Sequence, residues 1–201
     1  VSDLPFVTGK IKFHTRSNNN VNPDSYTEAM SVFNQGNDSN SSYGCSHPDN
    51  FTGVTNRNQG TGRSSRNFIA YSKTRFTVQA GEEGNWGIRY GADFGYGGGL
   101  YVDRVNILDE KWTTDLWWSS NWDNSDVLKG TVYLSAGEHE MEIIGGEPGN
   151  DGGLTVQFSR AYSGPTEYST ATWITFTSDN IEIRSEACPI PSLSISYGSH
   201  D

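Results

Sequence analysis

The side chains best suited to binding chemistry lie in one short acidic segment, residues 112–126. Four of the six tryptophans fall between Trp112 and Trp122, among several Asn, Ser and Asp residues. A flat aromatic ring stacks on the C–H face of a sugar, while amide and carboxylate groups hydrogen-bond its hydroxyls. We therefore predict a carbohydrate-binding site made of Trp117, Trp118, Asn121, Trp122 and Asp123.

A structural role is the alternative for part of this segment. Because neighbouring residues of a strand point to opposite faces, at least one of Trp117 and Trp118 is expected in the core. A loop of Ser, Asn and Asp is a poor partner for a core, so we also expect at least one exposed tryptophan.

Two glycine-rich loops carry further carboxylates. Residues 91–103 surround Asp93 and lack the Gly-Lys-Ser/Thr ending of a phosphate-binding loop. Glycine permits positive φ and close backbone approach, so Asp93 and nearby carbonyls can converge on a cation or a sugar hydroxyl. Residues 145–153 form the second loop, with Glu147 and Asp151. The alternatives are a structural β-bulge in the first loop and an ordinary hairpin turn in the second.

These loops must be positioned by β-strands, because apolar and polar residues alternate from residue 67 onward. The pattern recurs in roughly eight or more short segments, which is typical of an all-β antiparallel β-sandwich or jelly roll. Along residues 138–143, apolar residues alternate with glutamates that are expected to face solvent, while His139 is expected on the core side. The glutamates are Glu138, Glu140 and Glu142.

The chain is predicted to form one β-sandwich domain over residues 1–187, followed by a tail or linker at 188–201. Residues 17–67 are rich in Asn, Ser and Gly, and they predict a long irregular N-terminal insertion. Within it, residues 26–33 are expected to form one or two helical turns.

Charge and hydropathy exclude several partners. The chain has 24 acidic and 14 basic residues, a net charge of -10, which opposes attraction to nucleic acid and to anionic membranes. The sequence holds no apolar run of about 18 residues, so we predict no membrane span. It also has no charged-then-apolar leader, so we expect a mature or excised module of a larger surface or secreted protein.

The two cysteines, Cys45 and Cys188, belong to no Cys-x-x-Cys pair, so the sequence does not support a cysteine zinc site. We predict a single disulfide between them, joining the irregular N-terminal region to the end of the fold. Such a bond implies an oxidising, extracellular or cell-surface environment. Two free buried thiols are the alternative.

Three motifs resemble those of the PA14-like β-sandwich family of secreted glycan-binding and adhesin modules. Gly-Gly-Leu-Tyr-Val-Asp at residues 98–103 resembles the strand after its acidic loop. Residues 134–139 resemble its Leu-x-x-Gly-x-His strand entry, and residues 151–158 resemble its last core strand. The succession of Gly-Ala-Asp-Phe-Gly, Asp-Leu-Trp-Trp and an acidic glycine turn also resembles bacterial surface proteins. The resemblance covers residues 76–158.

The resemblance also bears on a metal ion. In calcium-dependent members of that family, the acidic loop carries two consecutive aspartates that hold Ca²⁺, and sugar hydroxyls complete the coordination of the ion. The matching positions here are Ala92 and Asp93, so one of the two carboxylates is absent. Asp93 is retained, and the second loop carries two more carboxylates, Glu147 and Asp151. Ca²⁺ is therefore a candidate cofactor, with Asp93, Glu147 and Asp151 as its candidate ligands.

The sequence thus predicts a non-catalytic extracellular carbohydrate-binding module whose partner is a polysaccharide or another glycan. A protein-binding adhesin or structural surface module is the first alternative, because aromatic residues also serve protein interfaces. A jelly-roll glycoside hydrolase or polysaccharide lyase is the second, although the sequence shows no nucleophile elbow, metal triad or His-Glu-x-x-His motif.

Overall fold

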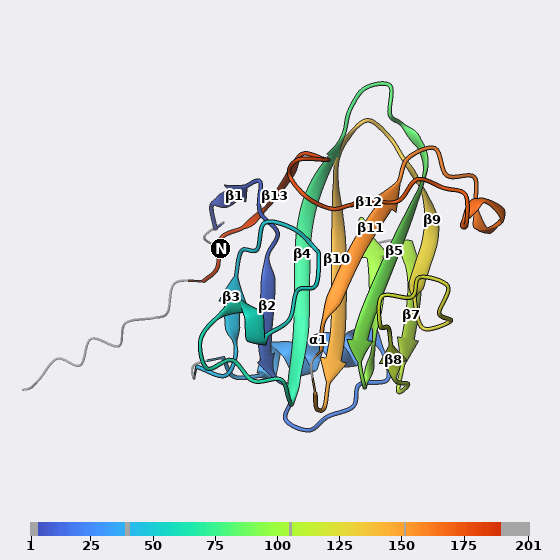
Figure 1. Ribbon diagram of the computed structural model, residues 1–201. Helices are drawn as coiled ribbons and strands as arrows, with labels where there is room; N and C mark the ends of the chain where they lie inside the picture. Colours follow the sequence, from blue (N-terminus) through green and yellow to red (C-terminus); the bar gives the residue numbers. More distant parts are fainter. Residues whose placement is uncertain (1–3, 39–40, 105, 151, 190–201) are drawn as a thin grey trace, which may run out of the picture.

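A computed structural model describes residues 4–38, 41–104, 106–150 and 152–189. In this part of the chain, two antiparallel β-sheets pack face to face (Figure 1). The prediction of an all-β sandwich is confirmed. No helix in the described residues is long and apolar enough to cross a membrane.

The larger sheet has the strand order β1-β13-β4-β10-β6-β7, with β2 beside β4 and β3 beside β2. Its strands are β1 (Phe6–Thr8), β2 (Phe13–Ser17), β3 (Gly44–Ser46), β4 (Phe68–Val78), β6 (Gly97–Val102), β7 (Asn106–Trp112), β10 (Gly137–Glu147) and β13 (Ile183–Glu186). We call it the eight-stranded sheet.

The second sheet, called the five-stranded sheet, is built around β5. It has β11 and then β12 on one side of β5, and β8 and β9 on the other. Its strands are β5 (Gly84–Phe94), β8 (Leu116–Trp117), β9 (Leu128–Leu134), β11 (Leu154–Ser159) and β12 (Ile174–Thr175).

The alternation seen in the sequence decides which face of each strand is buried. In β5, every second residue from Trp86 to Phe94 is buried in the core between the sheets. The opposing layer comes from β4, β6, β10 and β13, where Phe68, Phe76 and Leu100 belong to the same core cluster. Alternate side chains of the strands in both sheets therefore point inward and form one hydrophobic core between the sheets.

The predicted irregular insertion at residues 17–67 is more ordered than expected. It holds the helix α1 (Tyr26–Gln35), the strand β3 and the 3₁₀ turn η1 (Arg57–Gln59); a second turn, η2 (Pro165–Glu167), lies elsewhere. The helical turns predicted at residues 26–33 are confirmed and continue for two more residues. Ser25 begins the helix, because its side chain accepts a hydrogen bond from the Glu28 backbone N–H at 3.3 Å.

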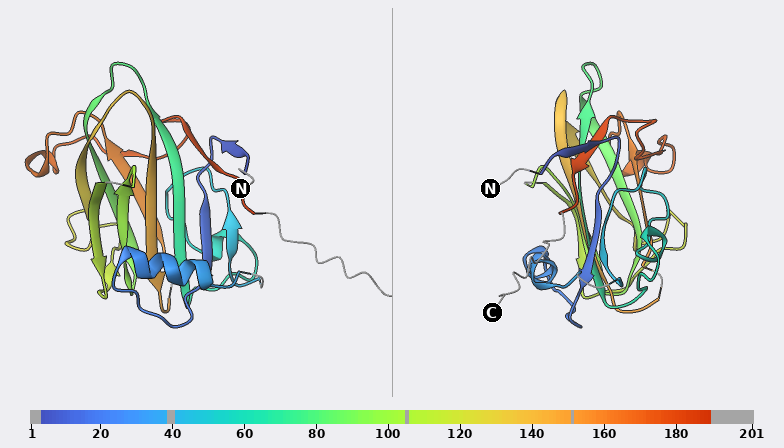
Figure 2. Two further views of the ribbon diagram at one scale, coloured as in Figure 1. Left: turned by 180° about the vertical axis from the view of Figure 1, so that it is seen from behind. Right: turned by 90° about the vertical axis from the view of Figure 1, so that its left-hand side faces the viewer.

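Helix α1 lies across the outer face of the eight-stranded sheet (Figure 2). Its buried residues Ala29, Val32 and Phe33 form a second apolar cluster with Ile69, Tyr101 and Ile144 of the sheet. This contact corrects one prediction, since Glu142 of β10 is only 1% exposed rather than facing solvent. His139 is half-buried, and its Nδ1 lies 2.7 Å from Asp103 Oδ2.

The predicted disulfide is present: Cys45 in β3 is bonded to Cys188, which follows β13, across a sequence separation of 143 residues. The alternative of two free thiols is therefore wrong. The bond joins the insertion to the end of the sandwich, as expected. The rest of the predicted tail, residues 190–201, lies outside the described residues.

Loss of this disulfide is expected to lower the free energy of unfolding by about 5 kcal/mol in the chain-entropy description, because the closed loop is long. Urea unfolding of the oxidised protein and of the double variant Cys45→Ala/Cys188→Ala measures the difference. A reductant should destabilise the wild type and leave the double variant unchanged. Equal unfolding midpoints for the two proteins would contradict this expectation.

Candidate functional site

The two glycine-rich segments predicted as loops contain much strand, since residues 91–94 belong to β5, residues 97–102 to β6 and residues 145–147 to β10. The shorter loops that follow β5 and β10 meet at one end of the sandwich, at the bottom of Figure 1. The Tyr96 backbone N–H donates to the Gly146 carbonyl at 2.9 Å. The Asp93 backbone N–H donates to the Gly153 carbonyl at 2.9 Å. The loops that follow β5 and β10 are therefore held together by main-chain hydrogen bonds.

The tryptophan segment reaches the same end through β8. In the antiparallel register of β5 and β8, Asp93 lies opposite Trp117 and Phe94 lies opposite Leu116. Leu116 and Phe94 are buried in the core, whereas Trp117 is 64% exposed. Because residues directly opposite each other share a face, Asp93 and Trp117 both lie on the outer face of the five-stranded sheet.

The backbone of Trp117 is held on both sides by side chains of its own segment. Its N–H donates to Asp126 Oδ2 at 3.2 Å, and its carbonyl accepts from Asn124 Nδ2 at 2.9 Å. Two of the predicted residues lie nearby: Asn121 Oδ1 accepts from the Asp123 backbone N–H at 3.1 Å, and the Asp123 side chain is exposed. Asn121 therefore shapes the turn.

Trp118 and Trp122 differ from Trp117, because they pack against the sheet. Their ring centroids are 4.8 Å apart. The Trp118 ring lies so close to Gly91 that a Cβ there would come within 2.5 Å of ring atoms. The Arg89 guanidinium lies 4.1 Å from the Trp122 ring centroid. These two half-buried rings fasten the segment to the outer face of β5. The expectation that Trp117 or Trp118 lies in the core is wrong, because β8 ends at Trp117 and the Trp118 ring packs over Gly91 instead of entering the sandwich.

Glu147 is buried at the junction of the two loops, with 2% of its surface exposed. Its Oε1 accepts from the Gly149 N–H at 2.6 Å and its Oε2 from the Gly95 N–H at 3.3 Å. Burial raises the pKa of Glu147 to about 7, and the nearby carboxylates Asp93 and Asp115 add to the rise, against the lowering effect of the two amides. The Glu147 carboxylate thus joins the loops.

The described residues do not fit a calcium ion by themselves. Among them, no group of three His, Cys, Asp or Glu residues is placed to hold a metal. Asp93 and Glu147 lie close enough to interact electrostatically, but both Glu147 oxygens already accept backbone hydrogen bonds. The third predicted ligand, Asp151, lies outside the described residues. Binding of Ca²⁺ stays a prediction.

Sequence reasoning missed the residues that cover the middle of β5. Arg89 is held between Trp122 and Trp173, with its guanidinium 4.4 Å from the Trp173 ring centroid. Its Nε donates to Gln157 Oε1 at 2.8 Å. The available signal was the alternation of Gly87, Arg89 and Gly91 in β5, because glycines on one face of a strand often mark close approach by other groups.

The raised pKa of Glu147 predicts a pH-dependent stability. The folded protein binds this proton more tightly than the unfolded chain, so the contribution is complete below pH 4.5 and is lost as the pH rises through about 7. This contribution to the free energy of unfolding is about 3 kcal/mol. In the variant Glu147→Gln, which stays neutral, the free energy of unfolding should lose this pH dependence.

Urea unfolding of both proteins between pH 4.5 and 8 makes the comparison. Glu182→Gln, at an exposed glutamate far from these loops in the sequence, is the control and should follow the wild type. An identical pH profile for Glu147→Gln and wild type would disprove the assignment.

No protein-family profile matches the sequence, and no curated protein matches it. Solved structures do share its fold. The PA14 sugar-binding domain of an RTX adhesin is 11% identical with a TM-score of 0.54, covering 86% of this chain and 97% of that one. The A domain of epithelial adhesin 9 from Candida glabrata, in complex with Galβ1-3GlcNAc, is 11% identical with a TM-score of 0.55, covering 89% of each chain.

An anti-sigma factor domain-containing protein is 10% identical with a TM-score of 0.58, covering 92% of this chain and 50% of that chain. At these identities the similarity concerns the fold. It agrees with the motifs at residues 98–103, 134–139 and 151–158. The chain therefore has the β-sandwich fold of PA14 domains and of epithelial-adhesin A domains.

Proposed function

We propose that this chain is a non-catalytic, extracellular carbohydrate-binding module whose sugar-binding surface lies around Trp117. The observation that carries the proposal is the register of β5 and β8, which places the exposed Trp117 ring directly opposite Asp93 on the same face. An aromatic face beside carboxylate and amide groups suits a sugar, which has apolar C–H faces and a rim of hydroxyls.

The fixed backbone of Trp117 supports this use. Hydrogen bonds from Asn124 and to Asp126 hold the residue before any ligand arrives. A pre-organised contact loses less conformational entropy on binding, so more of the stacking energy appears as affinity. The exposed side chain of Asp123 offers a further acceptor for sugar hydroxyls in the same segment. Two neighbours in fold support the proposal, since one is described as sugar-binding and another is complexed with Galβ1-3GlcNAc.

The absence of catalysis is part of the proposal. Glu147 has the raised pKa of a general acid, but it is buried and bonded to the Gly95 and Gly149 amides.

The disulfide supports an extracellular or cell-surface location, within a larger surface or secreted protein. A protein-binding surface module is the alternative that a binding experiment must separate from this one.

Replacing Trp117 by Ala is expected to abolish glycan binding on a glycan array while leaving the melting temperature nearly unchanged, because the ring stacks on nothing in the core. Tyr133→Ala is the matched control, because Tyr133 is equally exposed, at 66%, near the other end of β5. Trp118→Ala should instead cost about 2 kcal/mol of stability. Unaltered glycan binding by Trp117→Ala, or binding of a protein that free sugars do not displace, would refute the proposal.

The predicted calcium ion is tested by repeating the binding measurement in calcium and in EDTA. The donor set of the described residues leads us to expect that binding survives EDTA. Loss of binding in EDTA, restored by calcium and absent in Asp93→Asn, would instead support the predicted ligands Asp93, Glu147 and Asp151. Thermal unfolding of Asp93→Asn controls for a loss of structure.

A further inference from the structure

A recessed site lies on the other sheet, between the start of α1 and the strands β6, β7 and β10. This pocket has a volume of about 460 Å³, within the range of small-molecule sites. We call it the α1 pocket. Apart from two hydroxyl side chains at the start of α1, it is lined by Tyr26, Tyr101, Arg104, Ile107, Glu110 and Glu142. None of these residues belongs to the surface around Trp117.

The wall of the α1 pocket contains a buried carboxylate with one incompletely used oxygen. Glu142 is 1% exposed, and its Oε2 accepts hydrogen bonds from the hydroxyls of Tyr26 at 2.7 Å and Tyr71 at 2.8 Å. Its Oε1 accepts no hydrogen bond among the described residues. Arg104 Nε lies 3.3 Å from Oε1 as an ion pair. A buried carboxylate oxygen without a hydrogen-bond donor is a costly arrangement that a ligand donor would relieve.

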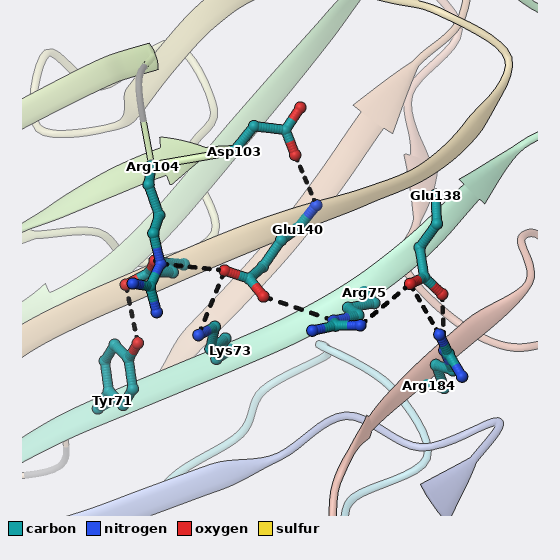
Figure 3. Close-up of polar contacts among 9 residues, drawn as sticks. Tyr71, Lys73, Arg75, Asp103, Arg104, Glu138, Glu140 and Arg184 are labelled. Carbon is teal, nitrogen blue, oxygen red and sulfur yellow. Dashed lines mark hydrogen bonds and ion pairs between the residues drawn. The ribbon is translucent and has the colours of Figure 1, made fainter. Parts of the chain in front are cut away.

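Arg104, the ion-pair partner of that oxygen, is mostly exposed and is shared with a second carboxylate. Its side chain is 66% exposed, and its Nε is also 3.4 Å from Glu140 Oε1. Figure 3 shows Arg104 reaching from the turn between β6 and β7 over β10, with Tyr71 below and the ion pairs of Glu140 beside it. Glu140 also pairs with Lys73 and Arg75. The guanidinium is therefore a cation at the pocket mouth that another cation can replace.

A second carboxylate and two aromatic rings complete the wall. Glu110 Oε2 accepts from the Tyr101 hydroxyl at 2.7 Å and from Trp112 Nε1 at 3.2 Å. The rings of Tyr26 and Tyr101 lie 4.8 Å apart at an interplanar angle of 67°. Burial, followed by the bond to Glu142, raises the pKa of Tyr26 to about 12, so its phenol stays a neutral donor. Crossed aromatic faces beside carboxylates are a typical setting for binding an ammonium group.

We propose that the α1 pocket binds a ligand through a primary ammonium group, which replaces Arg104 at Glu142 Oε1 and has Glu110 as its second carboxylate. Two carboxylates against one guanidinium leave an excess of negative charge in the lining. The start of α1 borders the pocket, and its dipole favours an anion, so the carboxylates must outweigh it. The ammonium group is carried by an amino sugar or by a lysine side chain.

The test is an NMR titration of the whole folded chain with glucosamine, with its neutral counterpart N-acetylglucosamine, and with Nα-acetyl-lysine amide. We expect the two ammonium compounds to shift the amides of α1 and of the β6–β7 turn, and N-acetylglucosamine to leave them unchanged. Stronger binding of glucosamine identifies an amino sugar as the source, and stronger binding of the lysine amide identifies a polypeptide.

Two variants change the charge of the pocket in opposite directions. Glu142→Gln should weaken binding of the ammonium compounds at least about tenfold, because a close charge pair is lost. Arg104→Gln should strengthen it several-fold, because the competing cation is removed while the backbone at this exposed turn is unchanged. Glu138→Gln is the matched control, since Glu138 lies on the same strand and pairs with Arg184 and Arg75 rather than with Arg104. Trp117→Ala should also leave this binding unchanged.

Three results would overturn the inference: no binding of either ammonium compound, equal binding of N-acetylglucosamine, or weaker binding by Arg104→Gln. The last would show that the pocket prefers an anion or a neutral sugar. Should Glu142→Gln unfold, the gain expected for Arg104→Gln still decides the question, because that side chain is mostly exposed. Failure of the carbohydrate site around Trp117 would leave these outcomes unaffected.

Discussion

The rest of the structure depends on the alternation of large and small side chains along β5. On its inner face, every second residue from Trp86 to Phe94 fills the core. On its outer face, the lack of a Cβ at Gly87 and Gly91 lets the rings of Tyr162 and Trp118 lie directly on the strand. A larger residue at Gly91 would displace Trp118, and with it the segment that presents Trp117. One strand thus determines both the core and the shape of the outer surface.

Strand β10 carries two buried glutamates whose carboxylates have different hydrogen-bond donors and different charged neighbours. Glu142 is bonded to two phenols and faces the Arg104 guanidinium. Glu147 has two backbone amides and no described cation, with acidic neighbours that raise its pKa. At Glu142, another cation can take the place of the Arg104 guanidinium. At Glu147, protonation of the carboxylate favours the folded state. Residues of one type, five positions apart, thereby link two different surfaces to the same strand.

The sequence was sufficient for features that depend on local periodicity. Alternating residues predicted the sandwich but not its strand order, so the sequence did not show that the two acidic segments meet. The same rule wrongly placed one of Trp117 and Trp118 in the core, because β8 ends at Trp117 and the Trp118 ring lies over Gly91 on the outer face of β5. Glu142 was misassigned because α1, more than a hundred residues earlier, covers that part of the sheet. The stacking of Trp122 and Trp173 on Arg89 was also missed, because the two rings come from loops that are far apart in the sequence.

The disulfide has a mechanical consequence for a domain of this kind. A pulling force that enters the chain before Cys45 and leaves after Cys188 passes through the sulfur bridge instead of through the intervening polypeptide. Under tension, β1, β2 and α1 can be drawn out, whereas the strands from β4 to β13 lie inside the covalent loop and add no length. Asp93, Trp117 and Glu147 are all inside it. The bond therefore shields the loop end of the sandwich from a load that the outer segments must bear.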